Sequence, residues 1–272
     1  MDGTLLDHYT YEFTPIQELL MDLKEHHIPI IPITSKTCAE MDYYCKQLGL
    51  VHGYGAENGA IVKIENPKSV IKQINYNQNE THKIQRSFAK PASHWRKLIS
   101  KIRGELKFST FNELSDSEVA ALTGLSIPMA RLARTREFGE VIHWQDTEKN
   151  LDQFKRSLER NGACLFQGGR FLHVTGDADK GMAMNWIVNH YSQVLDIKPV
   201  TIVAGDSKND IPMLSRADVA VVVRSPVHPP PIWSQSINDK QQKVITTVSN
   251  GPAGWKDGML IALEYVEELL SK

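Results

Sequence analysis

The sequence predicts an α/β fold in which a parallel sheet, with helices on both faces, is interrupted by an inserted α+β domain. Apolar runs alternate with helical patterns over residues 1–84, and the same alternation returns over residues 170–272. Strands separated by helices imply a parallel sheet with right-handed crossovers. Residues 85–169 instead mix helices with short strands, which indicates an inserted domain.

In the first part, Ile16 and the leucines that follow it recur at helical spacing, and Thr14-Pro15 suits the start of a helix. The stretch "IPIIPIT" is expected to be a buried strand with irregular ends, because prolines disfavour central strands. The polar residues 66–83 are expected to be a loop. The expected helices cover residues 16–27 and 38–50, and the expected strands residues 28–34 and 59–65.

The inserted domain is expected to hold four helices and three short strands. The helices cover residues 93–103, 115–125, 127–138 and 150–162, and the strands residues 140–145, 164–169 and 171–176. The final part returns to strands and helices in alternation. Its helices are expected at residues 180–195, 209–217 and 256–270, and its strands at residues 199–206, 219–223 and 243–247.

Composition places few limits on function. The chain has 272 residues, of which 41% are hydrophobic and 23% charged, and this is ordinary for a globular protein. A net charge of −1 gives no overall electrostatic reason to expect a nucleic acid or membrane partner. No signal peptide or membrane span is evident. Cys38, Cys45 and Cys164 have no metal-ligand spacing, and we expect free, buried or half-buried thiols in the cytoplasm.

Carboxylates gather where an apolar strand ends. The stretch "VTIVAGDSKND" delivers Asp206 at the carboxyl end of a strand, and Asp210 opens the next helix. Ligands of open α/β sheets bind at this edge, and two carboxylates suit a hard cation such as Mg²⁺. The alternative is a purely structural helix cap in which the acidic residues favour the positive end of the helix dipole.

Three more residues are candidates for phosphate chemistry. Lys180 lies at a helix start, where the helix dipole disfavours a cation, so a role in balancing phosphate or carboxylate charge would explain it. Thr34 ends a strand and is able to hydrogen-bond an anionic oxygen, or simply to cap the strand. Asp2 belongs to an Asp-Gly-Thr sequence near the start of the chain. A surface lysine, a strand cap and a turn aspartate are the structural alternatives.

Taken together, the order "DGTLL", a strand ending in Thr, Lys before a helix and "GDSKND" after a strand resembles the haloacid dehalogenase (HAD) superfamily of Mg²⁺-dependent phosphohydrolases. The resemblance is to the branch with a large C2-type cap between the second and third motifs. The segments "TSKTCAEM", "ENGA", "GGRFLHVTGDADKG", "GDSKNDIPML" and "GPAGW" are similar to landmarks of the mannosyl-3-phosphoglycerate phosphatase family, over almost the whole chain.

The resemblance implies a role for each matching residue. Asp2 would be the general acid and base, with its backbone carbonyl on Mg²⁺, and Lys180 would pair with phosphate and nucleophile. Asp206 would bind Mg²⁺ directly, and Asp210 would support the metal as a ligand or through a neighbour. The residues implied in substrate binding are Thr34, Ser35, Lys36, Asn58, Arg170 and Asn209.

The family's nucleophile is the first Asp of D-x-D-G-T, and here x is Met1. The apolar strand that should deliver that aspartate is also absent from the sequence, and its loss would leave neighbouring strands unpaired. We expect a start codon misassigned to the internal methionine of "DMDGT". A truncated protein without the nucleophile is the rival interpretation.

Other patterns are less specific. The stretch "GYGAENG" lacks the third glycine of a dinucleotide fingerprint, and the histidines lack metal-ligand spacing. Arg131, Arg134 and Arg136 would be a nucleic-acid patch, a solvated helix face or, by resemblance, partners of a glycerate carboxylate. Arg170, between glycines and a strand, has the better claim to that carboxylate.

The expected function is hydrolysis of mannosyl-3-phosphoglycerate to mannosylglycerate and phosphate through an aspartyl-phosphate intermediate, with Mg²⁺ as cofactor. The expected partner is a small sugar phosphate, with neither nucleic acid nor membrane. The alternatives are another sugar-phosphate phosphatase of the same superfamily and a catalytically inactive sugar-phosphate-binding protein. The oligomeric state cannot be read from the sequence.

Overall fold

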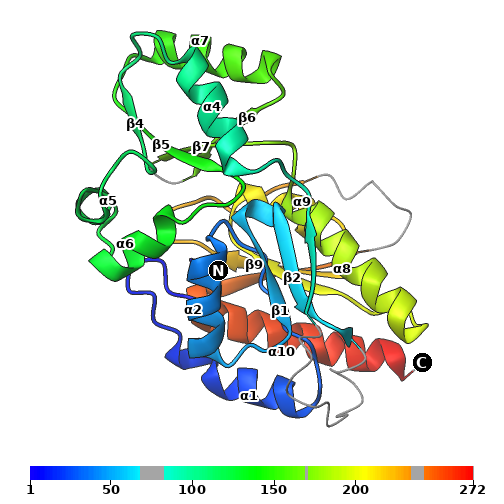
Figure 1. The fold of residues 1–272 in the computed structure, drawn as a ribbon. Coiled ribbons are helices and arrows are strands. Elements are labelled where there is room, and N and C mark those ends of the chain that lie inside the picture. Colours follow the sequence, from blue (N-terminus) through cyan, green and yellow to red (C-terminus); the bar gives the residue numbers. More distant parts are fainter. Residues whose placement is uncertain (68–82, 169–170, 234–241, 272) are drawn as a thin grey trace.

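The computed structural model describes residues 1–67, 83–168, 171–233 and 242–271 as two layers of structure, a core and a cap above it (Figure 1). The core is formed by the two ends of the chain, and the cap by its middle. No helix in the described ranges is both long enough and apolar enough to cross a membrane. The predicted loop at residues 66–83 lies almost entirely outside the described residues.

The first part of the core contains a sheet of order β1-β2-β3, in which both pairings are antiparallel. The helix α2 begins with a capping box, because the Thr37 hydroxyl accepts from the Glu40 amide and the Glu40 carboxylate accepts from the Thr37 amide. The elements are η1 (Thr14–Ile16), α1 (Gln17–Glu25), α2 (Cys38–Leu48), β1 (Gly53–Ala56), η2 (Glu57–Gly59), β2 (Ile61–Glu65) and β3 (Lys83–Ser87).

The last part of the core contains a parallel sheet of order β10-β9-β8, with β8 at its edge. The strand β9 is buried along nearly its whole length and reads as a continuous valine-rich run, as expected for a parallel strand covered on both faces. The elements are α8 (Lys180–Leu195), β8 (Ile202–Gly205), η3 (Lys208–Asp210), α9 (Ile211–Leu214), β9 (Val219–Arg224), β10 (Lys243–Asn250) and α10 (Gly251–Leu270).

The cap holds a four-stranded antiparallel sheet of order β4-β5-β7-β6. Helices α4 and α7 cover one face of this sheet, and the buried side chains of Trp95, Phe108 and Phe154 form the centre of the contact (Figure 1). The elements are α4 (Ala92–Ile102), β4 (Phe108–Thr110), α5 (Asp116–Thr123), α6 (Ile127–Arg134), β5 (Glu140–Trp144), α7 (Glu148–Arg160), β6 (Cys164–Gly168) and β7 (Phe171–Thr175).

Helices cover both faces of the core, which confirms the predicted doubly wound fold with an inserted α+β cap. One apolar cluster joins α1, α2 and α10 to β9, with Leu20, Leu48 and Trp255 among its buried members. A second cluster joins α8 to β2 through Ile187 and Val62. Because the two clusters lie on opposite faces, the sheets are sandwiched between helices.

The strand pairings extend past the residues at which the domain boundaries are predicted, 84/85 and 169/170. Strand β3 pairs with β2, so the first core sheet extends to Ser87. Strand β7 pairs with β5 and β6, so the cap sheet extends to Thr175. In both places the chain completes a hydrogen-bonded sheet before it leaves, and the composition of the sequence does not record those pairings.

Residues 28–34 differ from the expected buried strand, because they pair with β1 only through one parallel bridge between Ile33 and Gly55. Pro29 and Pro32 have no amide hydrogen to donate to a neighbouring strand. The predicted strand at residues 140–145, by contrast, is present as β5. All three cysteines are free, as expected, but Cys164 is exposed rather than half-buried.

Candidate active site

Asn58 brings two loops together at the carboxyl ends of the core strands. Its amide donates a 2.7 Å hydrogen bond to the carbonyl of Thr34, the residue that ends the segment 28–34. Its side-chain oxygen accepts a 3.1 Å hydrogen bond from Nδ2 of Asn209, in the loop after β8. Thr34 and Asn209 come from distant parts of the chain, so the structure places three of the predicted substrate-binding residues, these two and Asn58, at one edge of the core.

A buried ion pair fixes the loop after β8. Lys180 Nζ lies 2.6 Å from Asp210 Oδ1, and the side chains are 5% and 4% exposed. The other oxygen of Asp210 accepts from the amides of Asp206 and Ser207, each at 3.0 Å. Burial opposes ionisation of Asp210, but the neighbouring lysine attracts its negative charge, and the pKa of this carboxyl falls below its ordinary value. Both oxygens of Asp210 are therefore engaged in holding the loop.

Asp206 lies beside the Asp-Gly-Thr sequence at the start of the chain. Thr4 Oγ1 donates a 3.1 Å hydrogen bond to Asp206 Oδ1. Gly3 has a φ of +73°, and a Cβ on it would lie 2.7 Å from Asp206 Oδ2. Only glycine therefore allows this backbone to approach the carboxylate so closely. Burial, followed by repulsion from Asp210, raises the pKa of Asp206.

Lys36, which is buried, forms a second ion pair at the site. Its Nζ lies 2.9 Å from Asp2 Oδ1 and 3.8 Å from Glu40 Oε1. The same ammonium lies 5.0 Å from the ring centroids of Tyr11 and Tyr44, which is a cation–π distance. Burial opposes protonation, but the two carboxylates outweigh it, and the pKa of Lys36 is raised. Lys36 therefore holds Asp2 at the edge of the site.

Buried polar contacts join the cap to this edge, and sequence reasoning missed their centre, Glu57. Its carboxylate accepts from the amides of Glu137 and Phe138, at 2.7 and 3.1 Å. Arg136 lies 3.5 Å from the same carboxylate and donates a 3.0 Å hydrogen bond to the Ser35 carbonyl. The sequence does carry one signal for this turn, because Asn58 and Gly59 are residue types that tolerate a positive φ. Glu57 precedes them and itself adopts a φ of +50°.

A further contact between cap and core uses the Thr37 hydroxyl. This hydroxyl donates a 2.9 Å hydrogen bond to the carbonyl of Leu132, in α6 of the cap. It also accepts from the Glu40 amide at the start of α2. The cap is therefore tied to the residues that directly follow Thr34.

The arginines predicted as substrate partners differ in what they contact. Arg131 and Arg134 both pair with Asp116 within the cap, so they stabilise the contact between α5 and α6. Arg136 is the one of the three that reaches the core edge. Arg170 lies outside the described residues.

The donor chemistry at this edge suits Mg²⁺. Asp206 is 6% exposed, and among the described residues no lysine, arginine or histidine forms an ion pair with it, although the ammonium groups of Lys180 and Met1 attract its charge from farther away. A buried carboxylate that forms no ion pair favours a bound cation, and carboxylate oxygen is a preferred Mg²⁺ ligand. Within the described ranges, no group of three or more His, Cys, Asp and Glu side chains converges as a metal site. Backbone oxygen or water would have to complete the coordination.

The class of protein follows from a family comparison. Residues 1–227 match the family of haloacid dehalogenase-like hydrolases. The chain therefore belongs to this family, and the match covers both the first part of the core and the cap.

Solved structures with the same fold cover almost the whole chain. TM0651 from Thermotoga maritima aligns with a TM-score of 0.60 at 17% identity, over 97% of this chain and 94% of its own. BT4131, described as a HAD subclass IIB sugar phosphatase, aligns with a TM-score of 0.59 at 16% identity, over 98% and 96%. A haloacid dehalogenase-like hydrolase from B. subtilis aligns with a TM-score of 0.56 at 15% identity, over 95% and 94%. At these identities the likeness establishes the fold.

Proposed function

We propose that this chain is the main part of a Mg²⁺-dependent phosphatase that hydrolyses mannosyl-3-phosphoglycerate to mannosylglycerate and phosphate. The observation that carries the proposal is the meeting of Thr34, Asn58 and Asn209 beside the Lys180–Asp210 pair and Asp206. Hydroxyl, amide and ammonium groups bind phosphoryl oxygens, and a buried carboxylate binds the metal. This combination suits phosphoryl transfer, in which positioning and charge balance supply most of the catalysis.

In the proposed reaction, a carboxylate oxygen attacks phosphorus, and the bond from phosphorus to the ester oxygen breaks. Asp2 gives its proton to the leaving oxygen. Asp2 then takes a proton from water, the water oxygen attacks phosphorus, and the aspartyl–phosphate bond breaks to release inorganic phosphate. Lys180 balances phosphate charge throughout. Mg²⁺ held by Asp206 and the Asp2 carbonyl would reduce the repulsion between the nucleophile and the phosphate dianion.

The D-x-D-G-T pattern assigns the nucleophile to an aspartate joined directly to Met1. The test therefore compares two forms of the protein, each extended by an apolar strand that ends in either Asp or Asn before Met1. We expect the Asp form to release phosphate in the presence of Mg²⁺, and the Asn form to be slower by at least about a thousandfold. Equal phosphate release by both forms would reject the covalent mechanism.

Substrate choice is expected to depend on the cap, because the residues that meet at the core edge are suited to phosphate and metal, which all sugar phosphates share. The proposed substrate carries a carboxylate, and arginine binds a carboxylate with two parallel hydrogen bonds. Arg170 is the residue we propose for this role. A sugar phosphate of another kind is the alternative substrate, because BT4131, which shares this fold, is a sugar phosphatase.

The Arg170→Ala variant of the Asp-extended form tests the substrate. Loss of a charge-assisted partner costs about 2 kcal/mol, or roughly thirtyfold in kcat/KM. We expect that loss on mannosyl-3-phosphoglycerate and little change on p-nitrophenyl phosphate, which has no carboxylate. Equal losses on the two substrates would mean that Arg170 serves the phosphate or the fold.

A further inference from the structure

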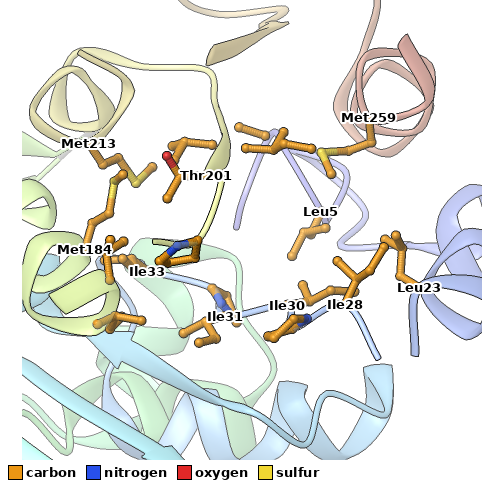
Figure 2. A pocket seen from close by; sticks show the side chains of 18 of the residues that line it. Leu5, Leu23, Ile28, Ile30, Ile31, Ile33, Met184, Thr201, Met213 and Met259 are labelled. Carbon is orange, nitrogen blue, oxygen red and sulfur yellow. The ribbon is translucent and has the colours of Figure 1, made fainter. Parts of the chain in front are cut away.

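Two pockets of the structure differ in the chemistry of their walls. One lies inside the core, between the segment 28–34 and strand β8, and is lined mostly by apolar side chains (Figure 2). The other lies between the core and the cap and has a volume of about 460 Å³. We call it the tyrosine pocket, because Tyr9, Tyr11, Tyr43 and Tyr44 line it.

Both domains contribute to the tyrosine pocket. The core supplies residues 9–13 and part of α2, and the cap supplies residues 124–129, where α5 ends and α6 begins. Helix α6 lies against α2 (Figure 1). The hydrogen bond from the Thr37 hydroxyl to the Leu132 carbonyl joins the same two helices. A ligand in this pocket would therefore touch the core and the cap at once.

The loop that carries Tyr9 and Tyr11 is held by its own hydrogen bonds. Asp7 Oδ1 accepts from the amides of Tyr9 and Thr10, each at 2.9 Å. These two amides lower the pKa of the Asp7 carboxyl. The Asp7 amide donates to the Glu12 carbonyl at 2.9 Å, which closes the loop. The core wall of the pocket is thus formed without a ligand, and this reduces the cost of binding one.

The pocket offers ring faces beside hydroxyl groups. Tyr9 and Tyr43 are 66% and 44% exposed, and the Tyr43 ring lies edge-on to the buried Tyr44 ring, with 5.2 Å between the centroids. Each tyrosine combines an apolar face with a hydroxyl that both donates and accepts. Ser126 begins α6 without using its hydroxyl as a cap, whereas the Ser115 hydroxyl caps α5. The Ser126 hydroxyl is therefore available to a ligand.

Charge restricts the class of ligand. Among the described residues, no charged side chain lines the tyrosine pocket, so an anion finds no counter-charge there. A cation is disfavoured as well, because the Lys36 ammonium already lies 5.0 Å from the ring centroids of Tyr11 and Tyr44 and would repel it. The walls therefore suit a neutral ligand that has both an apolar face and hydroxyl groups.

We propose that the tyrosine pocket is a binding site for a neutral sugar. The C–H face of a sugar ring packs on the exposed ring of Tyr43, and its hydroxyls form hydrogen bonds with Gln47 and Ser126. The pocket volume lies within the range of about 300–1,000 Å³ that is usual for small-molecule sites.

This site goes beyond the proposed phosphatase function. None of the residues that meet at the candidate active site, Thr34, Asn58 and Asn209, lines the tyrosine pocket. The sugar bound there needs no phosphate group. Because it would contact the cap as well as the core, it would also stabilise the contact between them.

The test titrates the 272-residue protein with two neutral sugars, methyl α-D-mannopyranoside and maltose, and measures Kd by isothermal titration calorimetry. The Tyr43→Ala variant removes the exposed ring. Lys46→Ala is the matched control, because Lys46 is an exposed residue of the same helix that does not line the pocket. We expect at least one sugar to bind the wild type and Lys46→Ala equally, and Tyr43→Ala at least about fivefold more weakly.

Absence of saturable binding by both sugars would overturn the proposal, and so would equal Kd values for the wild type and Tyr43→Ala. Tetramethylammonium is titrated in parallel. If it binds more tightly than the sugars and Tyr43→Ala weakens it, the pocket is a cation site and the proposal is wrong. The titrations use neither Mg²⁺ nor a phosphate ester, so their outcome is independent of the proposed phosphatase activity.

Discussion

The two buried lysines of the candidate site each bind an aspartate, but the two aspartates differ in their access to solvent. Asp210 is 4% exposed, and every oxygen of its carboxylate is engaged. Asp2 keeps 36% of its side-chain surface exposed, although Lys36 is as deeply buried as Lys180. The Lys180–Asp210 pair fixes a loop, whereas the Lys36–Asp2 pair positions a carboxylate that remains accessible to solvent. Two similar ion pairs at the same edge therefore have different roles, one structural and one that leaves a carboxylate accessible.

The largest expected effect on stability is the loss of the buried Lys180–Asp210 pair. Asp210→Ala leaves the Lys180 ammonium buried without a counter-charge and removes the acceptor for two loop amides. We expect a loss of about 3–5 kcal/mol in the free energy of unfolding, measured by urea denaturation. Asp116→Ala, which removes the surface partner of Arg131 and Arg134, is the control and should change the midpoint little. If both variants lose the same stability, burial does not distinguish the pairs.

The Lys36–Asp2 pair, whose aspartate is partly exposed, should contribute less to stability. Lys36→Met keeps most of the side-chain volume, and Asp2 can take up water when its partner is lost. We expect a loss of about 1–2 kcal/mol by urea denaturation, smaller than for Asp210→Ala. A larger loss than for Asp210→Ala would contradict the comparison.

The pH dependence of the same variant gives a sharper test. The pKa of Lys36 is raised above its ordinary value of 10.5, so its contribution to stability is complete below that value and is lost as pH rises through the higher folded value. The stability difference between the wild type and Lys36→Met should therefore stay constant from about pH 7 to 10 and narrow above 10.5. If the stability difference between the wild type and Lys36→Met increased above pH 10.5, the raised pKa of Lys36 would be contradicted.

The smallest expected effect is a gain of stability, expected for Asp206→Asn. The pKa of Asp206 is raised, so the folded protein favours its protonated form, and the penalty for its charge appears as pH rises above the ordinary carboxyl range. With chelator present, Asp206→Asn should stabilise the protein by on the order of 1 kcal/mol at pH 7, and by less at pH 4. A loss of stability at pH 7 would show that the Thr4 hydrogen bond outweighs desolvation.

Local patterns predicted the elements of this fold well, and its long-range contacts poorly. Asp206 and Lys180 could be found because each lies where a strand or helix visibly ends or begins. The partnership of Lys36 with Asp2 depends on the path of the chain between them, and no periodicity encodes it. The contact of Glu57 with Arg136 likewise joins the core to the cap across a long insertion. The membership of β3 and β7 in their sheets is likewise decided by pairing between strands, which the composition of the sequence does not record.

One hydroxyl has a wider consequence than its size suggests. Thr37 starts α2 and at the same time donates to the carbonyl of Leu132 in the cap. A valine in its place would keep the shape but remove both contacts together, whereas a serine would keep both. The start of α2 and the contact between cap and core therefore depend on the same hydroxyl oxygen. A substitution that removes this oxygen changes both at once.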